Sequence, residues 1–183
     1  MTRYIIGFLL SIGLIIVVII LIFRGSSAPA SQPLNLDSYA NTDAAVQLTV
    51  DSPVAASSTH HDIILNIDNT QATITVTQGY EGKTDTANAY PMNVNAYATF
   101  LHSLELNGFA DGNNNPSLSD DRGHCALGDR YIYEVINGGG NNLERYWSTS
   151  CATGTFEGNG PVIRQLFDAQ FPDYNSLTSN VTL

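Results

Sequence analysis

The sequence predicts an α+β protein in which an N-terminal transmembrane helix precedes a small antiparallel sheet with helices packed on one face. Two kinds of pattern lead to this class. An uncharged apolar run spans residues 4–23, and about 20 such residues are needed to cross the hydrocarbon core of a bilayer. Later segments either alternate between apolar and polar residues or repeat apolar residues at helical spacing. Their order along the chain is β-β-β-α-β-β-α.

The apolar run favours a retained anchor over residues 1–24, because the apolar part of a cleaved signal peptide is usually only about 7–15 residues long. We therefore expect the chain to contact the lipid bilayer through residues 4–23. The alternative is cleavage near Ala30, where a small-x-small triplet ends. In that case the product would be a secreted protein.

The rest of the chain divides into a stalk and one domain. Residues 25–43 begin with a small, polar, proline-bearing segment that predicts a flexible stalk, and a folded domain is expected over residues 44–183. All 17 acidic residues lie beyond the anchor, with five of the seven basic ones, so this part carries a formal charge of −12. Such a surface repels phosphate backbones, which excludes nucleic acid as an expected partner.

Three segments alternate in the way that antiparallel strands with one solvated face do. A tight turn over residues 68–70 is expected between the second and the third. The apolar members are Val46, Leu48 and Val50, then Ile63, Leu65 and Ile67, then Ala72, Ile74 and Val76.

Two later segments predict amphipathic helices. The first lies within residues 93–108, where apolar side chains fall at i, i+3, i+4 and i+7 from Tyr97. The second lies within residues 160–171, with a proline in its first turn and Pro172 after its end. These helices supply the apolar faces that would cover the sheet.

The stretch over residues 125–151 predicts a β-hairpin with a glycine-rich turn. If Ile136 pairs with Leu143, then Glu134 lies opposite Arg145. In the same register, the two aromatic residues of the second strand lie opposite Tyr133 and Ile132. Each such cross-strand pair contributes roughly 0.2–1 kcal/mol. A shift by one residue would oppose two glutamates, so the first register is preferred.

The only two cysteines, Cys125 and Cys151, bracket this hairpin. The predicted register brings them close enough for a disulfide, and their spacing is unlike a paired Cys-x-x-Cys zinc motif. Disulfides persist outside the cytosol. We therefore expect a single-pass protein of the cell membrane, with a cytoplasmic N-terminus and an extracytoplasmic C-terminal domain.

Residues 111–122 partly match a calcium-binding loop. The glycine and the closing glutamate of such a loop are replaced by Pro116 and Arg122. The main interpretation is a polar loop without a cofactor, and a calcium site of another geometry is the alternative. Its ligands would come from Asp111, Asn113, Asn115, Asp120 and Asp121.

The histidines do not predict a metal site. His60 and His61 are consecutive at the start of a strand, so their side chains point to opposite faces. Hydrolase, zinc-protease and phosphate-loop motifs are also missing from the sequence. Enzymatic activity is therefore not expected, although a pocket with converging carboxylates or histidines would favour a small hydrolase.

The hairpin aromatics allow two interpretations. They form the core beneath the helices, or part of them is exposed and binds another surface or secreted protein. The residues concerned are Tyr131, Tyr133, Tyr146 and Trp147.

The anchor, the segment "RGHCALGDRYIYE" and the run "WSTSC…GTFEGN…LFDAQFPDY" resemble an uncharacterised family of membrane-anchored bacterial surface proteins. This resemblance implies placement at the cell surface and no activity. The order of elements is also similar to that of small protease-inhibitor domains, without a shared motif. The expected function is a membrane-tethered extracytoplasmic module for recognition or structure, with a cell-surface protease inhibitor and a small hydrolase as alternatives.

Overall fold

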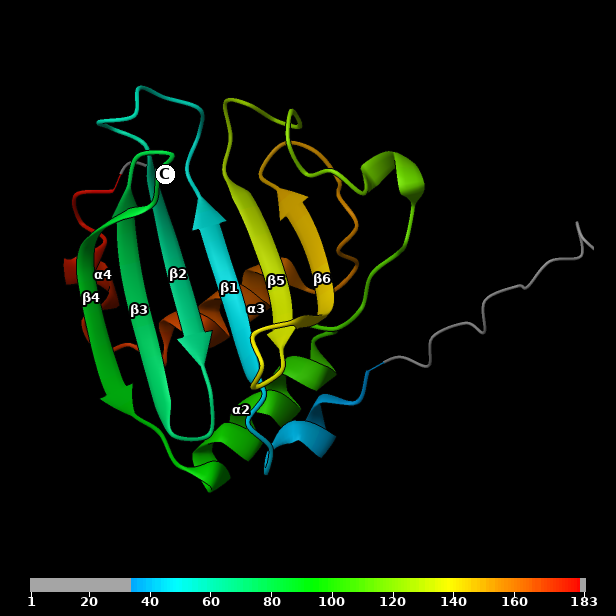
Figure 1. Cartoon of the computed structure of the whole chain (residues 1–183). Helices are drawn as coiled ribbons and strands as arrows, with labels where there is room; N and C mark the ends of the chain where they lie inside the picture. The colour runs from blue at the N-terminus through cyan, green and yellow to red at the C-terminus, as the bar shows by residue number, and fades with distance from the viewer. Residues whose placement is uncertain (1–33, 182–183) are drawn as a thin grey trace, which may run out of the picture. The chain divides into compact units, whose positions relative to one another are not determined.

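The computed structural model describes residues 34–181, which form a six-stranded antiparallel sheet with helices on one face (Figure 1). None of the helices in this range is long and apolar enough to cross a membrane. The predicted anchor over residues 1–24 and the triplet ending at Ala30 lie outside the described residues. The strands are β1 Ala45–Asp51, β2 His61–Ile67, β3 Gln71–Gln78, β4 Lys83–Pro91, β5 Arg130–Ile136 and β6 Asn142–Thr149. The helices are α2 Val94–Leu106, α3 Gly160–Asp168 and α4 Tyr174–Leu177, with 3₁₀ turns η1 Leu36–Tyr39 and η2 Pro116–Leu118.

The strand order is β4-β3-β2-β1-β5-β6, and every neighbouring pair is antiparallel. The α+β class and the first three strands are thereby confirmed. Leu48 lies opposite Leu65, which in turn lies opposite Ile74, so the alternating apolar residues form rows on one face. The hairpin of β5 and β6 joins the same sheet because β1 also pairs with β5.

The strand β4 is missing from the predicted order. It lies at one edge of the sheet, and most of its residues are exposed. An edge strand with most of its side chains exposed has little apolar surface to bury, so its sequence lacks the alternation by which strands are recognised.

The core lies between the sheet and the helices α2 and α3, which cover one face (Figure 1). Tyr97, in the first turn of α2, is fully buried, and its hydroxyl donates to the carbonyl of Ala44 at 2.9 Å. Phe100 of α2 meets Phe167 of α3 edge to face, with ring centroids 5.2 Å apart. Both predicted helices are therefore confirmed, each with an asparagine side chain capping its first turn.

The folded domain begins earlier than residue 44. Leu36 of η1 is fully buried in the core, and Ala40 is buried beside it. The backbone N–H of Leu36 donates to Oε2 of Glu105 on α2 at 2.7 Å. The predicted stalk over residues 25–43 is thus too long at its C-terminal end.

The predicted hairpin register is confirmed at its centre. Glu134 lies opposite Arg145, Tyr133 opposite Tyr146, and Ile132 opposite Trp147. The register shifts after Val135, so that Ile136 lies opposite Asn142 rather than Leu143. This β-bulge next to the turn accommodates one extra residue of β6. The other paired side chains of the hairpin keep the faces that the predicted register gives them.

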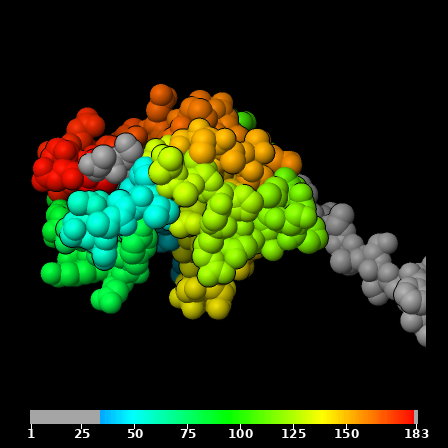
Figure 2. Space-filling view, turned by 90° about the horizontal axis from the view of Figure 1, so that it is seen from above, coloured from blue at the N-terminus to red at the C-terminus, as the bar shows by residue number. Residues whose placement is uncertain are grey.

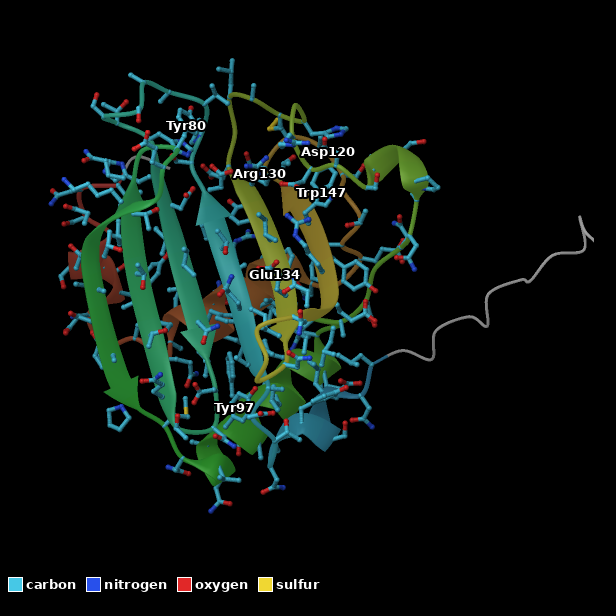
Figure 3. All side chains as sticks on the ribbon, in the orientation of Figure 1. Tyr80, Tyr97, Asp120, Arg130, Glu134 and Trp147 are labelled. Atoms are coloured by element: carbon cyan, nitrogen blue, oxygen red, sulfur yellow. A yellow bond between two sulfur atoms is a disulfide. The ribbon has the colours of Figure 1, made fainter. Side chains whose placement is uncertain are left out.

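Within residues 34–181 no α-helix covers the second face of the sheet, but the long connection that contains η2 packs on its β5–β6 side. Trp147 projects from this face and is covered by the connection, where its indole N–H donates to the carbonyl of Leu118 at 2.8 Å (Figure 3). The polar segment that the sequence predicts as a loop therefore covers the side chain of the single tryptophan.

Candidate functional site

The predicted disulfide is confirmed, because Cys125 and Cys151 are bonded with their Cα atoms 5.8 Å apart. Cys125 is the one non-glycine residue of the described part with a positive φ, at 55°. A tight turn follows it, in which the N–H of Gly128 donates to its carbonyl at 3.0 Å. The bond thus holds residues 123–128, here called the clamp loop, against the end of the hairpin.

The hairpin aromatics are interior residues. Tyr133 and Trp147 are each 1% exposed, and Tyr146 is 8% exposed. Tyr133 stacks on Phe156 on the helix-covered face, whereas Trp147 lies on the opposite face. The interpretation as one exposed binding surface is therefore wrong for these three. Tyr131 is half-buried beneath the guanidinium of Arg164, 4.2 Å from its ring centroid.

The polar loop residues are engaged with one another and with arginines. Asn113 donates to Glu157 at 2.8 Å and accepts from the N–H of Asn115. Asp120 binds Arg122 at 2.8 Å, and this guanidinium lowers the pKa of the carboxyl group. The calcium site stays a prediction that this geometry does not support. Of its remaining members, Asp121 lies between two arginines and Asp111 shares a turn with Gly108.

A different group of ionisable side chains converges at the upper end of the sheet in Figure 1. Asp51 ends β1 and lies directly opposite Asp62 at the start of β2. On the other side Asp51 lies opposite Arg130 of β5, and the two form an ion pair. Two carboxylates opposite each other repel, so this end of the sheet needs positive charge to be stable.

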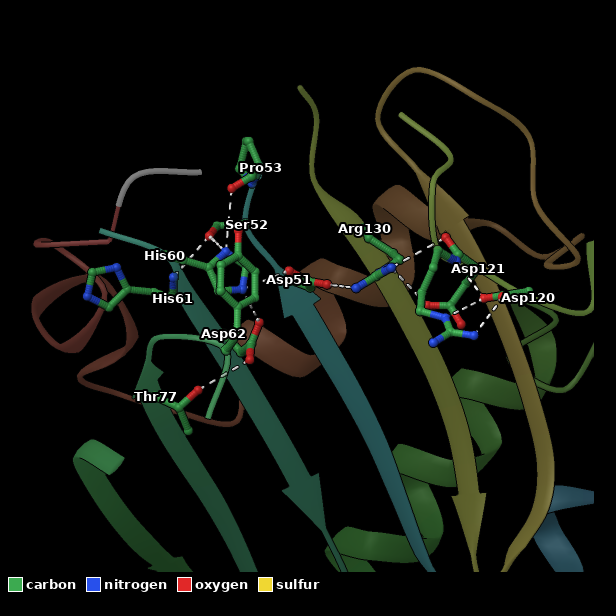
Figure 4. A network of polar contacts seen from close by, with 12 residues as sticks. Asp51, Ser52, Pro53, His60, His61, Asp62, Thr77, Asp120, Asp121 and Arg130 are labelled. Atoms are coloured by element: carbon green, nitrogen blue, oxygen red, sulfur yellow. Dashed lines mark hydrogen bonds and ion pairs between the residues drawn. The ribbon is translucent and has the colours of Figure 1, made fainter. Parts of the chain in front are cut away.

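His60 lies between the two carboxylates (Figure 4). Its Nε2 is 3.4 Å from Oδ1 of Asp51 and 3.5 Å from Oδ1 of Asp62. Its Nδ1 lies 3.1 Å from Oγ of Ser52, which also accepts the N–H of His61 at 3.0 Å. The imidazole is only 4% exposed. Within the described residues, Asp51, His60 and Asp62 are the one group of three His, Cys, Asp or Glu whose ligand atoms all lie within 4.8 Å.

A pocket of about 270 Å³ opens beside this group. One wall is the β1–β2 connection with Tyr80, and the other is the clamp loop. Figure 2 shows these segments next to each other at the end of the sheet, with residues near 55 in cyan and residues near 125 in yellow-green. The backbone N–H of Val54 donates to the carbonyl of Ala126 at 2.9 Å and ties the two walls together.

The side chain of Tyr80 holds the pocket in shape. Its ring stacks on His60 with centroids 4.1 Å apart. Its hydroxyl donates to the carbonyl of Ala55 at 2.9 Å and accepts the N–H of the same residue at 3.2 Å. The ring of His60 is therefore packed on one side and hydrogen-bonded at its edge.

The charges continue along the open face as an alternating chain. Arg130 also pairs with Asp121 at 3.1 Å, and Asp121 pairs with Arg145 at 3.0 Å. Arg145 reaches Glu134 at 3.4 Å. These contacts attach the long connection between α2 and β5 to the sheet. They also hold the acidic and basic side chains beside the pocket in fixed positions relative to one another.

Burial shapes the titration of this group. It raises the pKa of Asp62, and the nearby His60 acts in the opposite direction. Burial also lowers the pKa of Arg130, with a contribution from Arg145. In the part of the chain that the structure describes, the side-chain partners of Asp62 are His60 and, at 3.4 Å, the hydroxyl of Thr77. The imidazole and the two carboxylates can together hold a cation.

Sequence reasoning did not find this site, although part of its signal is local. His60 and Asp62 are two residues apart, so they share one face of an extended strand. In the sequence the nearest candidate partner of His60 is its neighbour His61, but the side chain of His61 points elsewhere and contacts the carbonyl of Thr59 at 3.0 Å. The third member, Asp51, comes from another strand and required the pairing of β1 with β2.

Comparisons of the chain with protein-family models, with curated proteins and with solved structures found no match. The resemblance to anchored bacterial surface proteins therefore stays a prediction.

Proposed function

We propose that the chain is a membrane-tethered module of the extracytoplasmic side that binds another surface or secreted protein beside the clamp loop. The tether is the apolar run over residues 4–23, and the placement is supported by the Cys125–Cys151 disulfide. Alkylation of protein from its native host tests the placement. Both thiols should be blocked until a reductant is added, and two free thiols would overturn it.

One observation carries the recognition role. Val54, Tyr80 and Leu127 are 64%, 58% and 90% exposed, and they are half of the six large apolar side chains that are exposed in the described domain. Val54 and Tyr80 line the pocket, and Leu127 lies in the clamp loop, whose neighbouring residues Ala126 and Gly128 line it. Together these three exposed side chains are called the apolar rim. Exposed apolar groups gathered at one place mark interaction surfaces more often than scattered ones do.

The charge of the domain indicates the chemistry of the partner. Beyond the anchor the chain has five basic and seventeen acidic residues. Two of the acidic residues, Asp51 and Asp62, line the pocket. A partner that presents an apolar side chain flanked by basic residues would complement both the rim and the net charge.

The test is proximity labelling from the full-length protein in its own membrane. Leu127→Ser removes the most exposed apolar side chain of the rim, and Leu106→Ser is the matched control, since Leu106 is 73% exposed on α2. A residue that anchors an interface costs more than about 1 kcal/mol when truncated, which is about a fivefold loss of binding. Labelled neighbours should fall by that factor with Leu127→Ser alone. Equal labelling by both variants and the parent would refute the recognition role.

A cell-surface protease inhibitor is a narrower form of this proposal. Leu127 lies two residues after Cys125, in a loop held by the disulfide, and its exposure suits insertion into the pocket of a protease. Incubation with secreted proteases would show inhibition by the parent and loss of it with Leu127→Ser.

A small hydrolase is the second candidate, and the converging group around His60 favours it. The two ring nitrogens are divided between a hydroxyl and carboxylates, as in serine hydrolases, although here Nδ1 faces the hydroxyl and Nε2 faces the carboxylates. Ser52 is only 6% exposed, however, and its Oγ already accepts a backbone N–H. Ester and phosphoester substrates test this role with His60→Gln, against His61→Gln as control. Loss of a general base costs about 10²–10⁴-fold, so equal rates in the parent and His60→Gln would end it.

A further inference from the structure

The group at the end of the sheet is short of positive charge. Asp51 and Asp62 are direct cross-strand partners, a position where like charges destabilise a sheet. Arg130 pairs with Oδ2 of Asp51. Among the described residues, however, only His60 forms an ion-pair contact with Asp62. One further cation would balance the two carboxylates.

The separations within the group match a tetrahedral metal site. Zinc binds histidine nitrogen and carboxylate oxygen at about 2.0–2.2 Å, so two ligand atoms of a tetrahedral site are about 3.3–3.6 Å apart. Nε2 of His60 is 3.4 Å from Asp51 Oδ1 and 3.5 Å from Asp62 Oδ1. Both separations are longer than a good N–H···O hydrogen bond of about 2.7–3.2 Å. The third separation, between the carboxylate oxygens, lies within 4.8 Å. Because χ2 of aspartate is a soft torsion, each carboxylate can adjust its orientation to a bound ion.

We propose that Asp51, His60 and Asp62 bind a divalent transition-metal ion of the zinc type. Imidazole with carboxylates suits such an ion, whereas calcium and magnesium prefer oxygen ligands alone. Three protein ligands leave one tetrahedral position for water or for a group from a bound partner. That position belongs to the pocket that Asp51, His60 and Asp62 line together with His124 and Arg130.

The surroundings of His60 orient it for this role. Metal-binding histidines commonly use their second nitrogen in a hydrogen bond that sets the tautomer. Nδ1 of His60 lies 3.1 Å from Ser52 Oγ, which leaves Nε2 to face the carboxylates. Stacking on Tyr80 and burial to 4% exposure restrict the ring further. The inference does not depend on the identity of any protein partner.

The test uses the full-length chain in detergent, purified without a polyhistidine tag and stripped with a chelator. Isothermal titration with zinc chloride should give one ion per chain, and calcium chloride should give no comparable binding. His60→Gln and Asp62→Asn should each weaken zinc binding by about 100-fold or more. Ser52→Ala should weaken it by about 10-fold, the lower end for a residue that orients a ligand. His61→Gln is the matched control and should bind zinc as the parent does.

Fluorescence of Trp147 reports whether each variant is folded, since this single tryptophan is buried in the sheet. Cobalt(II) gives a second readout, because a tetrahedral site produces visible absorption that the parent should show and Asp62→Asn should lose. A folded parent that binds no zinc, or binding that survives both His60→Gln and Asp62→Asn, would overturn the proposal. Either result would leave the recognition role of the apolar rim untouched.

Discussion

Removal of the disulfide should lower the free energy of unfolding by about 3.5 kcal/mol. Cys125 and Cys151 are 26 residues apart, and closing a loop of that length costs the unfolded chain about 12 cal/mol/K in the chain-entropy model. The folded state should survive the loss because other contacts close the same end of the hairpin. The N–H of Ser150 donates to the carbonyl of Asp129 at 2.9 Å, and the N–H of Asp129 donates to Oγ of Ser150 at 3.0 Å.

The measurement is urea unfolding followed by Trp147 fluorescence, with the parent compared to a variant in which alanine replaces both cysteines. For a domain with a urea dependence of about 1–3 kcal/mol per M, the midpoint should fall by about 1.2–3.5 M. The parent in excess reductant is the control and should match the variant. A loss below about 1 kcal/mol would refute the entropic reasoning, and a variant without a folded baseline would show that the native state itself requires the bond.

Three further outcomes are expected in the same urea titration. Tyr97→Phe should lose about 1–1.5 kcal/mol, because it removes the hydroxyl that binds the Ala44 carbonyl in the core; an unchanged midpoint would contradict the buried bond. Burial raises the pKa of Asp168 from 3.8 to about 6. The folded state therefore binds more protons than the unfolded state, and this contribution to stability is present below pH 3.8 and lost as the pH rises through about 6. Asp168→Asn should flatten the pH dependence in that window, and a parallel profile would count against it. Gly112→Ala should destabilise the fold, since its Cβ would overlap the ring of Tyr146, whereas Gly139→Ala, at an exposed turn, should be nearly neutral.

The strands that pack beneath the helices could be predicted because burial forces their residues to alternate. Val46, Leu48 and Val50 are all buried, as their spacing indicates. The edge strand β4 could not be predicted in this way, since most of its residues are exposed. The hairpin was predictable for another reason, namely that its register sets Glu134 against Arg145.

The aromatic residues of the hairpin show what a local sequence pattern cannot predict. Trp147 and Tyr146 are adjacent in a strand and project to opposite faces, yet both are buried. Tyr146 is buried on the helix side, and Trp147 is buried by a connection whose path the sequence does not reveal. A strand pattern states which residues share a face, but it does not state what covers that face.

The sequence by itself determined the apolar run, the class of the fold, the two helices and the cysteine pair, because each depends on periodicity or composition within a short stretch. Only the tertiary structure decided that β1 lies between β2 and β5. That pairing places Asp51 beside both Asp62 and Arg130, and so creates the charged group around His60. The physical reason is that charge interactions depend on distance in space, and residues far apart in the chain become neighbours only when strands pair.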